Sequence, residues 1–161
     1  MVQQELPEID LLEAIHSTPA RRYLSDKSIP DNIIWNILDA AIRGPSGANN
    51  QNWIWMVVKE KHIKTKIADW YLEGWNQAYG TRRESILNGT DNSDNLGRNS
   101  YLSAEYLANH IADAPVWILP ILRNIASSNT ARAGSSIYGA VQNLILAARA
   151  YGIGTTLTTL L

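Results

Sequence analysis

One short polar stretch, residues 44–53, carries the side chains best suited to bind a ligand. Asn49 and Gln51 have amide side chains that both donate and accept hydrogen bonds, and Ser46 has a hydroxyl. Gly47 lets backbone N–H groups approach a ligand closely. These groups suit a flat ligand that carries carbonyls, ring nitrogens and a phosphate. The alternative interpretation is an Asn-rich turn that caps a helix and has no other role.

A pair of adjacent arginines, Arg21 and Arg22, could bind an anion. The pair follows Pro19, which interrupts any helix. Each guanidinium presents a planar fork of donors that matches a phosphate. The alternative is an ordinary solvated surface.

The composition argues against several classes of function. The chain has no cysteine and three scattered histidines, so we expect no thiol nucleophile and no Cys- or His-based metal site. A net charge of −1 provides no electrostatic attraction to nucleic acid or to a membrane surface. No apolar run approaches the ~18 residues of a membrane span, and no signal peptide is recognisable, which favours a cytoplasmic location.

The spacing of apolar residues predicts the helices that would position these groups. A short amphipathic helix is expected over 8–16, and a longer one from Asp31 to the Gly44-Pro45 pair. Asp31 is expected either as the N-cap or as an acidic residue of the first turn. Further helices are predicted over 61–79, 101–111 and 135–151. Alanines keep the last helix narrow, which favours close packing against other helices. For the helix over 101–111 we expect a buried set of four side chains: Leu102, Tyr106, Leu107 and Ile111.

Two apolar runs, 53–58 and 116–122, predict strands that are buried on both faces within a sheet. A third β-rich segment begins at Thr155 and runs to the last residue, Leu161. Because the chain stops within this apolar signal, we expect residues 1–161 to be a single domain that is truncated at its C-terminus. Residues 80–99 are polar and rich in glycine, which predicts either a mobile loop or lid, or a surface excursion without order.

Three motifs, in this order, resemble those of the FMN-dependent nitroreductase family. The segment 45–53, Pro-Ser-Gly-Ala-Asn-Asn-Gln-Asn-Trp, is similar to the family's Pro-Ser-x-x-Asn-x-Gln-Pro-Trp loop and departs from it at Asn52. Residues 113–116, Asp-Ala-Pro-Val, resemble the Ala-Pro-Val start of a core strand. Residues 140–155 resemble the family's Ala-x-Gln-Asn-Leu helix and its Gly-x-Gly-Thr turn.

The resemblance implies an α+β fold in which helices wrap a mostly antiparallel sheet and two chains interlock as a homodimer. FMN would lie at the dimer interface. The implied reaction transfers hydride from NADH or NADPH through the flavin to a nitroaromatic, a quinone or a similar small acceptor. Because the flavin is the reactive centre, no catalytic side chain is expected.

The resemblance also implies which residues bind FMN. Arg22 matches a basic position of the family's phosphate-binding segment, whereas Thr18 and Pro19 stand where the family has basic residues. Arg21 is a hypothetical substitute for them. The polar loop would reach the flavin of the partner chain through five residues: Pro45, Ser46, Gly47, Asn49 and Gln51. Three further positions fall where family members present backbone and hydroxyl groups to the isoalloxazine ring: Leu157, Thr158 and Thr159.

Two alternatives remain open beside the oxidoreductase. The first is a relative that binds flavin or forms dimers without turnover, because its phosphate contacts and its C-terminal part are incomplete. The second is a relative that breaks flavin down. We expect the choice of electron acceptor to depend on residues 80–100.

Overall fold

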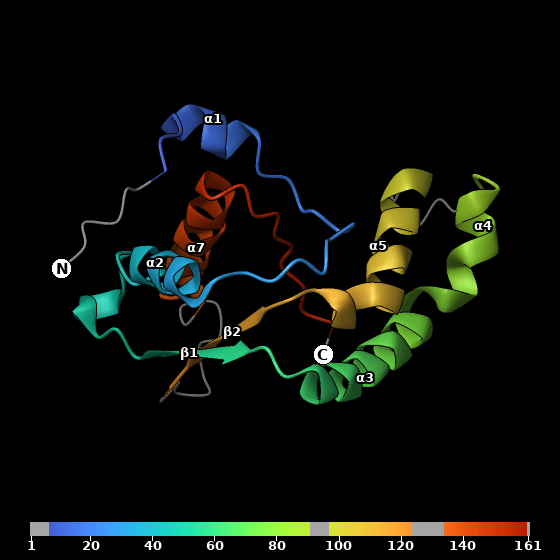
Figure 1. Ribbon diagram of the computed structural model, residues 1–161. Coiled ribbons are helices and arrows are strands. Elements are labelled where there is room, and N and C mark those ends of the chain that lie inside the picture. The colour runs from blue at the N-terminus through green and yellow to red at the C-terminus, as the bar shows by residue number, and fades with distance from the viewer. Residues whose placement is uncertain (1–6, 91–96, 124–133, 161) are drawn as a thin grey trace.

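The computed structural model describes residues 7–90, 97–123 and 134–160 (Figure 1). The helices and strands in these ranges are α1 (Leu11–His16), α2 (Asp31–Ala41), β1 (Trp53–Val58), α3 (Lys61–Tyr79), α4 (Arg83–Leu87), α5 (Arg98–His110), β2 (Trp117–Leu122) and α7 (Tyr138–Ala150). Short 3₁₀ turns lie at Gly47–Asn49, called η1, and also at Gly80–Arg82 and Ile111–Asp113. Among the described residues, no helix is long and apolar enough to cross a membrane.

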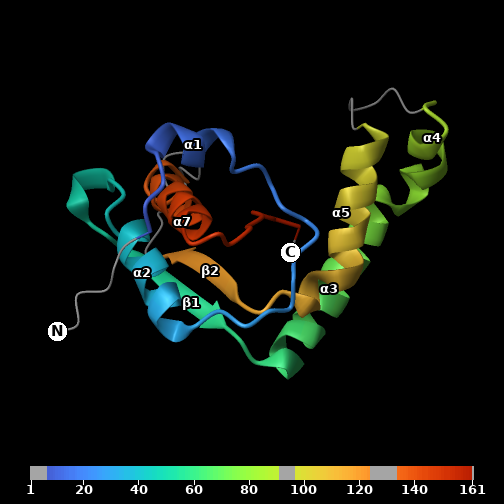
Figure 2. The ribbon, with the colours of Figure 1, turned by 45° about the horizontal axis from the view of Figure 1, so that its top comes forward.

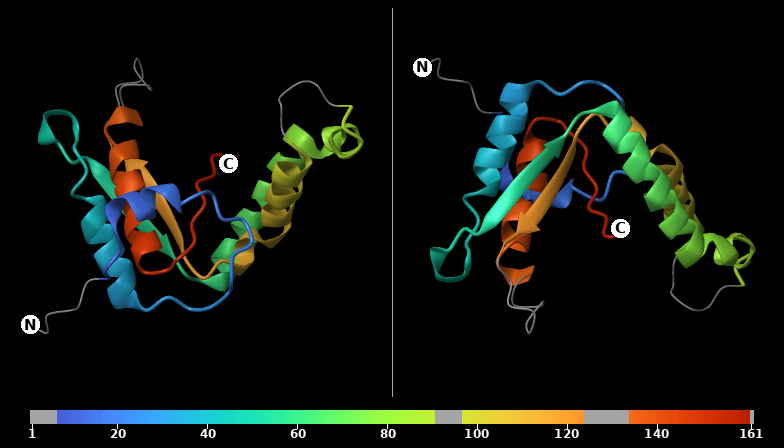
Figure 3. Two further views of the ribbon diagram at one scale, coloured as in Figure 1. Left: turned by 90° about the horizontal axis from the view of Figure 1, so that it is seen from above. Right: turned by 90° about the horizontal axis from the view of Figure 1, so that it is seen from below.

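The strands β1 and β2 pair antiparallel, from Trp53 opposite Leu122 to Val58 opposite Trp117. The prediction that β1 is buried on both faces is wrong within this chain. Ile54 and Met56 are 43% and 49% exposed, because successive strand residues point to opposite faces and only one face meets α7. Figure 3, from below, shows the strands in front of α7 with no described helix over them.

Helices α2 and α7 pack side by side next to the sheet (Figure 1). Pro30 is the N-cap of α2 and Asp31 is its acidic first-turn residue, which decides between the two predicted roles of Asp31. A Cβ at Gly44 would lie 2.8 Å from the Cα of Ala140, so the backbones approach too closely for any side chain there. The expected narrow surface of α7 is therefore confirmed at its contact with the end of α2.

Helices α3 and α5 stand apart from the sheet and share a second core (Figure 2). Of the set predicted to be buried in α5 and the turn after it, Leu107 and Ile111 are buried. The prediction is wrong for Tyr106, which is 37% exposed, and Leu102 is only half-buried. Tyr101 and Ala108 are buried in their place, because the face toward α3 runs through residues 101, 104, 108 and 111.

The loop predicted over 80–99 contains a helix. Helix α4 occupies Arg83–Leu87, and its Ile86 is 5% exposed in the core shared by α3 and α5. Two adjacent apolar residues, Ile86 and Leu87, are too few to give a periodic signal, so the helix depends on the tertiary contact of Ile86. The part of the loop over 91–96 lies outside the described residues.

Helix α7 begins at Tyr138, three residues later than predicted, and ends as predicted at the glycine turn. Gly152 has φ = 73°, and the amide of Ile153 donates to the carbonyl of Ala148 at 2.9 Å. The predicted β-rich segment is wrong over its described part, 155–160, which is extended but belongs to no strand. Its neighbours are the N-terminal segment and α3, and neither of these is a strand.

Candidate functional site

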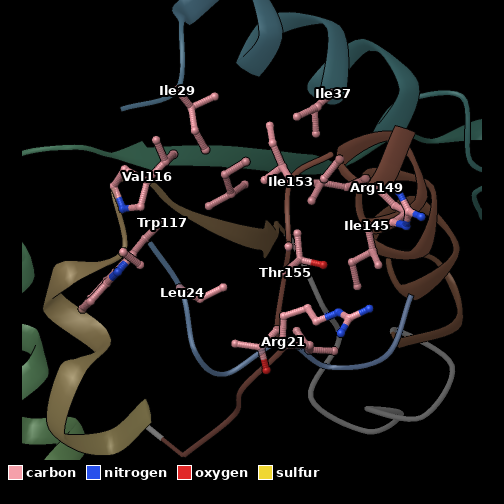
Figure 4. Close-up of a pocket in the computed structure, with 18 of the residues that line it drawn as sticks. Arg21, Leu24, Ile29, Ile37, Val116, Trp117, Ile145, Arg149, Ile153 and Thr155 are labelled. Carbon is pink, nitrogen blue, oxygen red and sulfur yellow. The ribbon is translucent and has the colours of Figure 1, made fainter. Parts of the chain in front are cut away.

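A cavity of about 1110 Å³ lies between the N-terminal segment 17–30, helices α2 and α7, strand β2 and the segment 152–159 (Figure 4). Its volume is slightly above the range typical of small-molecule sites, roughly 300–1,000 Å³. The walls are mainly apolar: Ile29, Ile37, Val116, Trp117, Ile145 and Ile153. Cationic and hydroxyl side chains also line it: Arg21, Lys27, Arg149, Thr155, Thr158 and Thr159. This mixture suits a ligand with an apolar body and an anionic end.

The cavity depends on a contact between the two ends of the chain. The backbone amide of Arg21 donates to the carbonyl of Thr155 at 2.8 Å. Gly154 permits this contact, because a Cβ there would lie 3.2 Å from both Cβ and Cγ of Arg21. Figure 4 shows Arg21 and Thr155 near each other in the cavity. The glycine turn after α7 thereby holds the arginine segment in place.

The two adjacent arginines diverge. Arg21 lines the cavity, and its Nη2 donates to the carbonyl of Ser17 at 3.3 Å. Arg22 does not line the cavity, and its Nη1 donates to Oγ of Ser103 on α5 at 3.3 Å. Consecutive side chains of an extended segment point in opposite directions, so one guanidinium group lies in the cavity and the other lies against α5.

Leu157, Thr158 and Thr159 all line the cavity, as does Arg21. The hydroxyls of Tyr71 and Thr158 are 2.8 Å apart and share a hydrogen bond, and Tyr71 is 4% exposed. The end of this segment packs closely against Gly74 of α3. A Cβ at that position would lie only 3.0 Å from the carbonyl oxygen of Leu160, so a larger residue would crowd it. Helix α3 therefore orients the segment that follows α7.

The polar loop lies elsewhere. None of Pro45, Ser46, Gly47, Asn49 and Gln51 lines the cavity of its own chain. Figures 1 and 2 show η1 beyond the end of α2, away from the segment 155–160. The structure thus brings Arg21 together with Leu157, Thr158 and Thr159, and it leaves the five loop residues and Arg22 outside that group.

The polar loop holds a strained backbone. Ala48, Asn49 and Gln51 have φ values of 53°, 54° and 46°, in the left-handed region that few residues other than glycine adopt. The hydroxyl of Ser46 accepts a hydrogen bond from the amide of Gln51 at 3.1 Å, and the Gln51 side chain donates to Oδ1 of Asn49 at 3.0 Å. Each such residue costs about 1–3 kcal/mol, and strain of this kind clusters at ligand sites.

A buried lysine fixes the start of β2 beside the cavity. Nζ of Lys64 on α3 donates to the carbonyl oxygens of Ala114 and Pro115, at 2.5 and 3.4 Å. Burial lowers the pKa of Lys64 below its usual value; Asp113 opposes this shift, and Lys61 adds to it. The lysine orders the turn from which the strand with Trp117 begins.

Sequence reasoning missed several polar groups of the cavity, and three of them carry nitrogen donors. Arg149 and Lys27 line it, and so does Trp55, whose buried Nε1 has no hydrogen-bond partner among the described residues. A donor buried without a partner is rare in proteins. No local pattern could have identified these groups, because they come from a helix, a loop and a strand that meet only in the folded chain.

Comparisons with known proteins agree on the family. The model of the Nitroreductase family matches residues 16–161. A putative NADH dehydrogenase/NAD(P)H nitroreductase of Methanothermobacter thermautotrophicus is 32% identical over 68 residues, which are 42% of this chain and 36% of that protein. Iodotyrosine deiodinase of Hydra vulgaris is 32% identical over 60 residues, which are 37% of this chain and 22% of that protein. The chain thus covers less than two thirds of either relative's length.

A solved structure supports the same fold. The crystal structure of oxidized iodotyrosine deiodinase bound to FMN and 3-iodo-L-tyrosine aligns with a TM-score of 0.70 at 20% identity. The alignment covers 93% of this chain and 74% of that one. The predicted nitroreductase-like fold class is thereby confirmed. The match of the family model over residues 16–161 shows that the chain belongs to the Nitroreductase family.

Proposed function

We propose that the chain is the subunit of an FMN-dependent oxidoreductase that transfers hydride from NADH or NADPH to a nitroaromatic, a quinone or a similar small acceptor. The observation that carries the proposal is the cavity of about 1110 Å³, with its apolar walls, its arginines and its threonine-rich segment. Family membership supports flavin-dependent redox chemistry. The name of the archaeal relative supports a nicotinamide donor.

The donor set of the cavity fits FMN. Apolar side chains such as Trp117 suit the faces of a three-ring system, and guanidinium groups suit a phosphate monoester. When bound, FMN would accept hydride from the nicotinamide and pass it to the acceptor.

The side chains of this protein would bind and orient the cofactor. Arg21 would bind the phosphate, while Leu157, Thr158 and Thr159 would present backbone and hydroxyl groups to the ring. The hydrogen bond between Tyr71 and Thr158 fixes this segment before the ligand arrives, and donors fixed in advance stabilise charge best. Arg22 would support the arginine segment through Ser103 instead of touching the phosphate.

A second copy of the chain would complete the site as a homodimer. Five residues of the polar loop do not line the cavity of their own chain, so we propose that they contact the cavity of a partner: Pro45, Ser46, Gly47, Asn49 and Gln51. The strained backbone of the loop supports a binding role. The exposed Ile54 and Met56 on the open face of the sheet also support association.

A second class of acceptor, the halogenated aromatics, is favoured by one observation. Relatives named iodotyrosine deiodinase appear both in the sequence comparison, at 32% identity, and in the structural comparison, with a TM-score of 0.70. Reductive removal of a halogen from a phenol would use the same cavity and the same cofactor.

Flavin absorbance tests the proposal. We expect the purified protein to bind FMN, and anaerobic NADH or NADPH to bleach the bound flavin. Nitroaromatic, quinone and 3-iodotyrosine should then be compared for their ability to restore the absorbance. Binding without bleaching by either nicotinamide would reject the oxidoreductase in favour of a flavin-binding protein without turnover. Loss of the flavin itself during the reaction would indicate a flavin-degrading relative.

A further inference from the structure

Two arginines from distant parts of the chain converge on one residue, Ser17. Nη2 of Arg21 donates to the backbone carbonyl of Ser17 at 3.3 Å, and Nε of Arg149 donates to its hydroxyl at 2.9 Å. Both arginines line the cavity, and Figure 4 shows them on the same side of it. The first comes from the N-terminal segment and the second from the last turn of α7.

The two guanidinium groups lack close carboxylate partners. Among the described residues, Arg21 has no ion pair, and Arg149 has only Glu13, whose Oε1 is 3.8 Å from Nη2 and whose side chain is 63% exposed. Arg43 and Arg83, which lie outside the cavity, each bond a carboxylate at 2.6 and 2.8 Å. Two like charges that share only one distant and exposed carboxylate repel each other, and a bound anion would relieve this repulsion.

Ser17 explains how the two groups are held. It is the C-cap of α1, and its hydroxyl also donates to the carbonyl of Glu13 at 2.6 Å. Its carbonyl and hydroxyl therefore anchor one arginine each. Arg149 uses Nε for this bond, which leaves N–H groups of its fork for a further acceptor. Arg149 lines the cavity, and its side chain is 30% exposed.

We propose that Arg149 is the second phosphate ligand of the flavin and acts together with Arg21. Its charge would take the place of the basic side chains that the family has at two positions where this chain has Thr18 and Pro19. This inference rests on the proposed function, because it names the residue that recognises the phosphate of FMN. Ser17 is the positioning residue for both arginines.

Comparing FMN with riboflavin, which lacks the phosphate, tests the role of Arg149. We expect Arg149→Gln to raise the Kd for FMN roughly 10- to 100-fold, measured by quenching of flavin fluorescence, because a charged hydrogen bond is lost. The Kd for riboflavin should stay within about twofold, since the phosphate is the only group that the arginine would contact. Arg83→Gln removes a guanidinium outside the cavity and should change neither Kd.

A purely structural role makes a different prediction. If Arg149 only tethers α7 to α1, Arg149→Gln will raise the Kd for FMN and the Kd for riboflavin by the same factor. That result would overturn the inference. Ser17→Ala removes the hydroxyl bonded to Arg149 but keeps both charges, so we expect FMN to bind more weakly than to the wild type and more tightly than to Arg149→Gln. Unchanged FMN binding by Arg149→Gln also overturns it, while the proposed function stands.

A separate measurement covers the case in which the wild type binds neither flavin, which would reject the proposed function. Inorganic phosphate should then still raise the Tm of the wild type relative to chloride at equal ionic strength. The rise should be lost in Arg149→Gln and kept in Arg83→Gln. An equal rise in all three proteins would reject the anion site as well.

Discussion

The amide of Arg21 donates a 2.8 Å hydrogen bond to the carbonyl of Thr155, and this bond joins the two ends of the chain at the cavity. The bond places an arginine next to the segment that holds Leu157, Thr158 and Thr159. The cationic and the ring-facing parts of the proposed flavin site therefore depend on one backbone contact. Substitutions around this contact should affect both parts together.

Gly154→Val should separate these two segments. The added Cβ would lie 3.2 Å from the Cβ and Cγ of Arg21, and a branched side chain increases the crowding. We expect a loss of about 1–3 kcal/mol of stability and weaker FMN binding. Urea unfolding and a flavin titration measure the two effects. Gly97→Val is the control for the flavin titration, because nothing lies within 4 Å of a Cβ at that position; an equal loss of FMN affinity in both variants would contradict the argument.

Tyr71→Phe should loosen the segment after α7 without creating a cavity. The variant removes the hydroxyl that shares a 2.8 Å hydrogen bond with Thr158 and keeps the buried ring. We expect a cost of about 0.5–1.5 kcal/mol and faster amide hydrogen exchange over 155–160. Tyr106→Phe, at a ring that is 37% exposed, is the matched control. Exchange that is unchanged in Tyr71→Phe would show that Thr158 is held by other contacts.

Two substitutions at Asn49 separate backbone strain from ligand binding. Asn49 has φ = 54°, so Asn49→Ala removes the amide and leaves a residue that tolerates this backbone less well than Asn, whereas Asn49→Gly removes both the amide and the strain. We expect both variants to weaken FMN binding, although Asn49→Gly should be at least as stable as the wild type. Ser46→Ala should weaken FMN binding as well, since the hydroxyl accepts a hydrogen bond from the amide of Gln51 within the loop. Unchanged affinity in all three variants would reject the role of the loop.

The buried Lys64 should make the free energy of unfolding depend on pH in the alkaline range. Burial lowers the pKa of Lys64 in the folded chain below its ordinary value of 10.5. Between these two pKa values the unfolded chain binds a proton that the folded chain has released, so the free energy of unfolding rises with pH. Below the folded pKa both states are protonated, and the cost of burying the charge is fully present.

Lys64→Met isolates this contribution. We expect the free energy of unfolding of the wild type, minus that of Lys64→Met, to increase as the pH rises toward 10.5. Denaturant titrations at several alkaline pH values give this difference. Lys66→Met is the control for an exposed lysine on the same helix. A difference that falls with pH would mean that the charged lysine is stabilised in the folded chain.

Local periodicity predicted most of the elements correctly. Strand β1 and helix α3 have the predicted bounds, and β2 begins one residue late, because strand and helix periods are visible within one segment. The errors have a common cause. The structure around Ile86 in α4, Tyr106 on α5 and the segment 155–160 depends on which distant residues they meet, and neighbours in sequence do not specify this.

Residue types at short spacing are enough to predict most of the helices and strands, and they carry the three motifs from which the resemblance to the family follows. The folded chain as a whole places Arg21 in the cavity and Arg22 against α5, and it brings Arg149 to Ser17 beside Arg21. The residue types of the polar loop predict a binding role, but its position outside the cavity of its own chain follows only from the fold. The reason is physical: a side chain's type is local, whereas the partners it meets depend on how the whole chain packs.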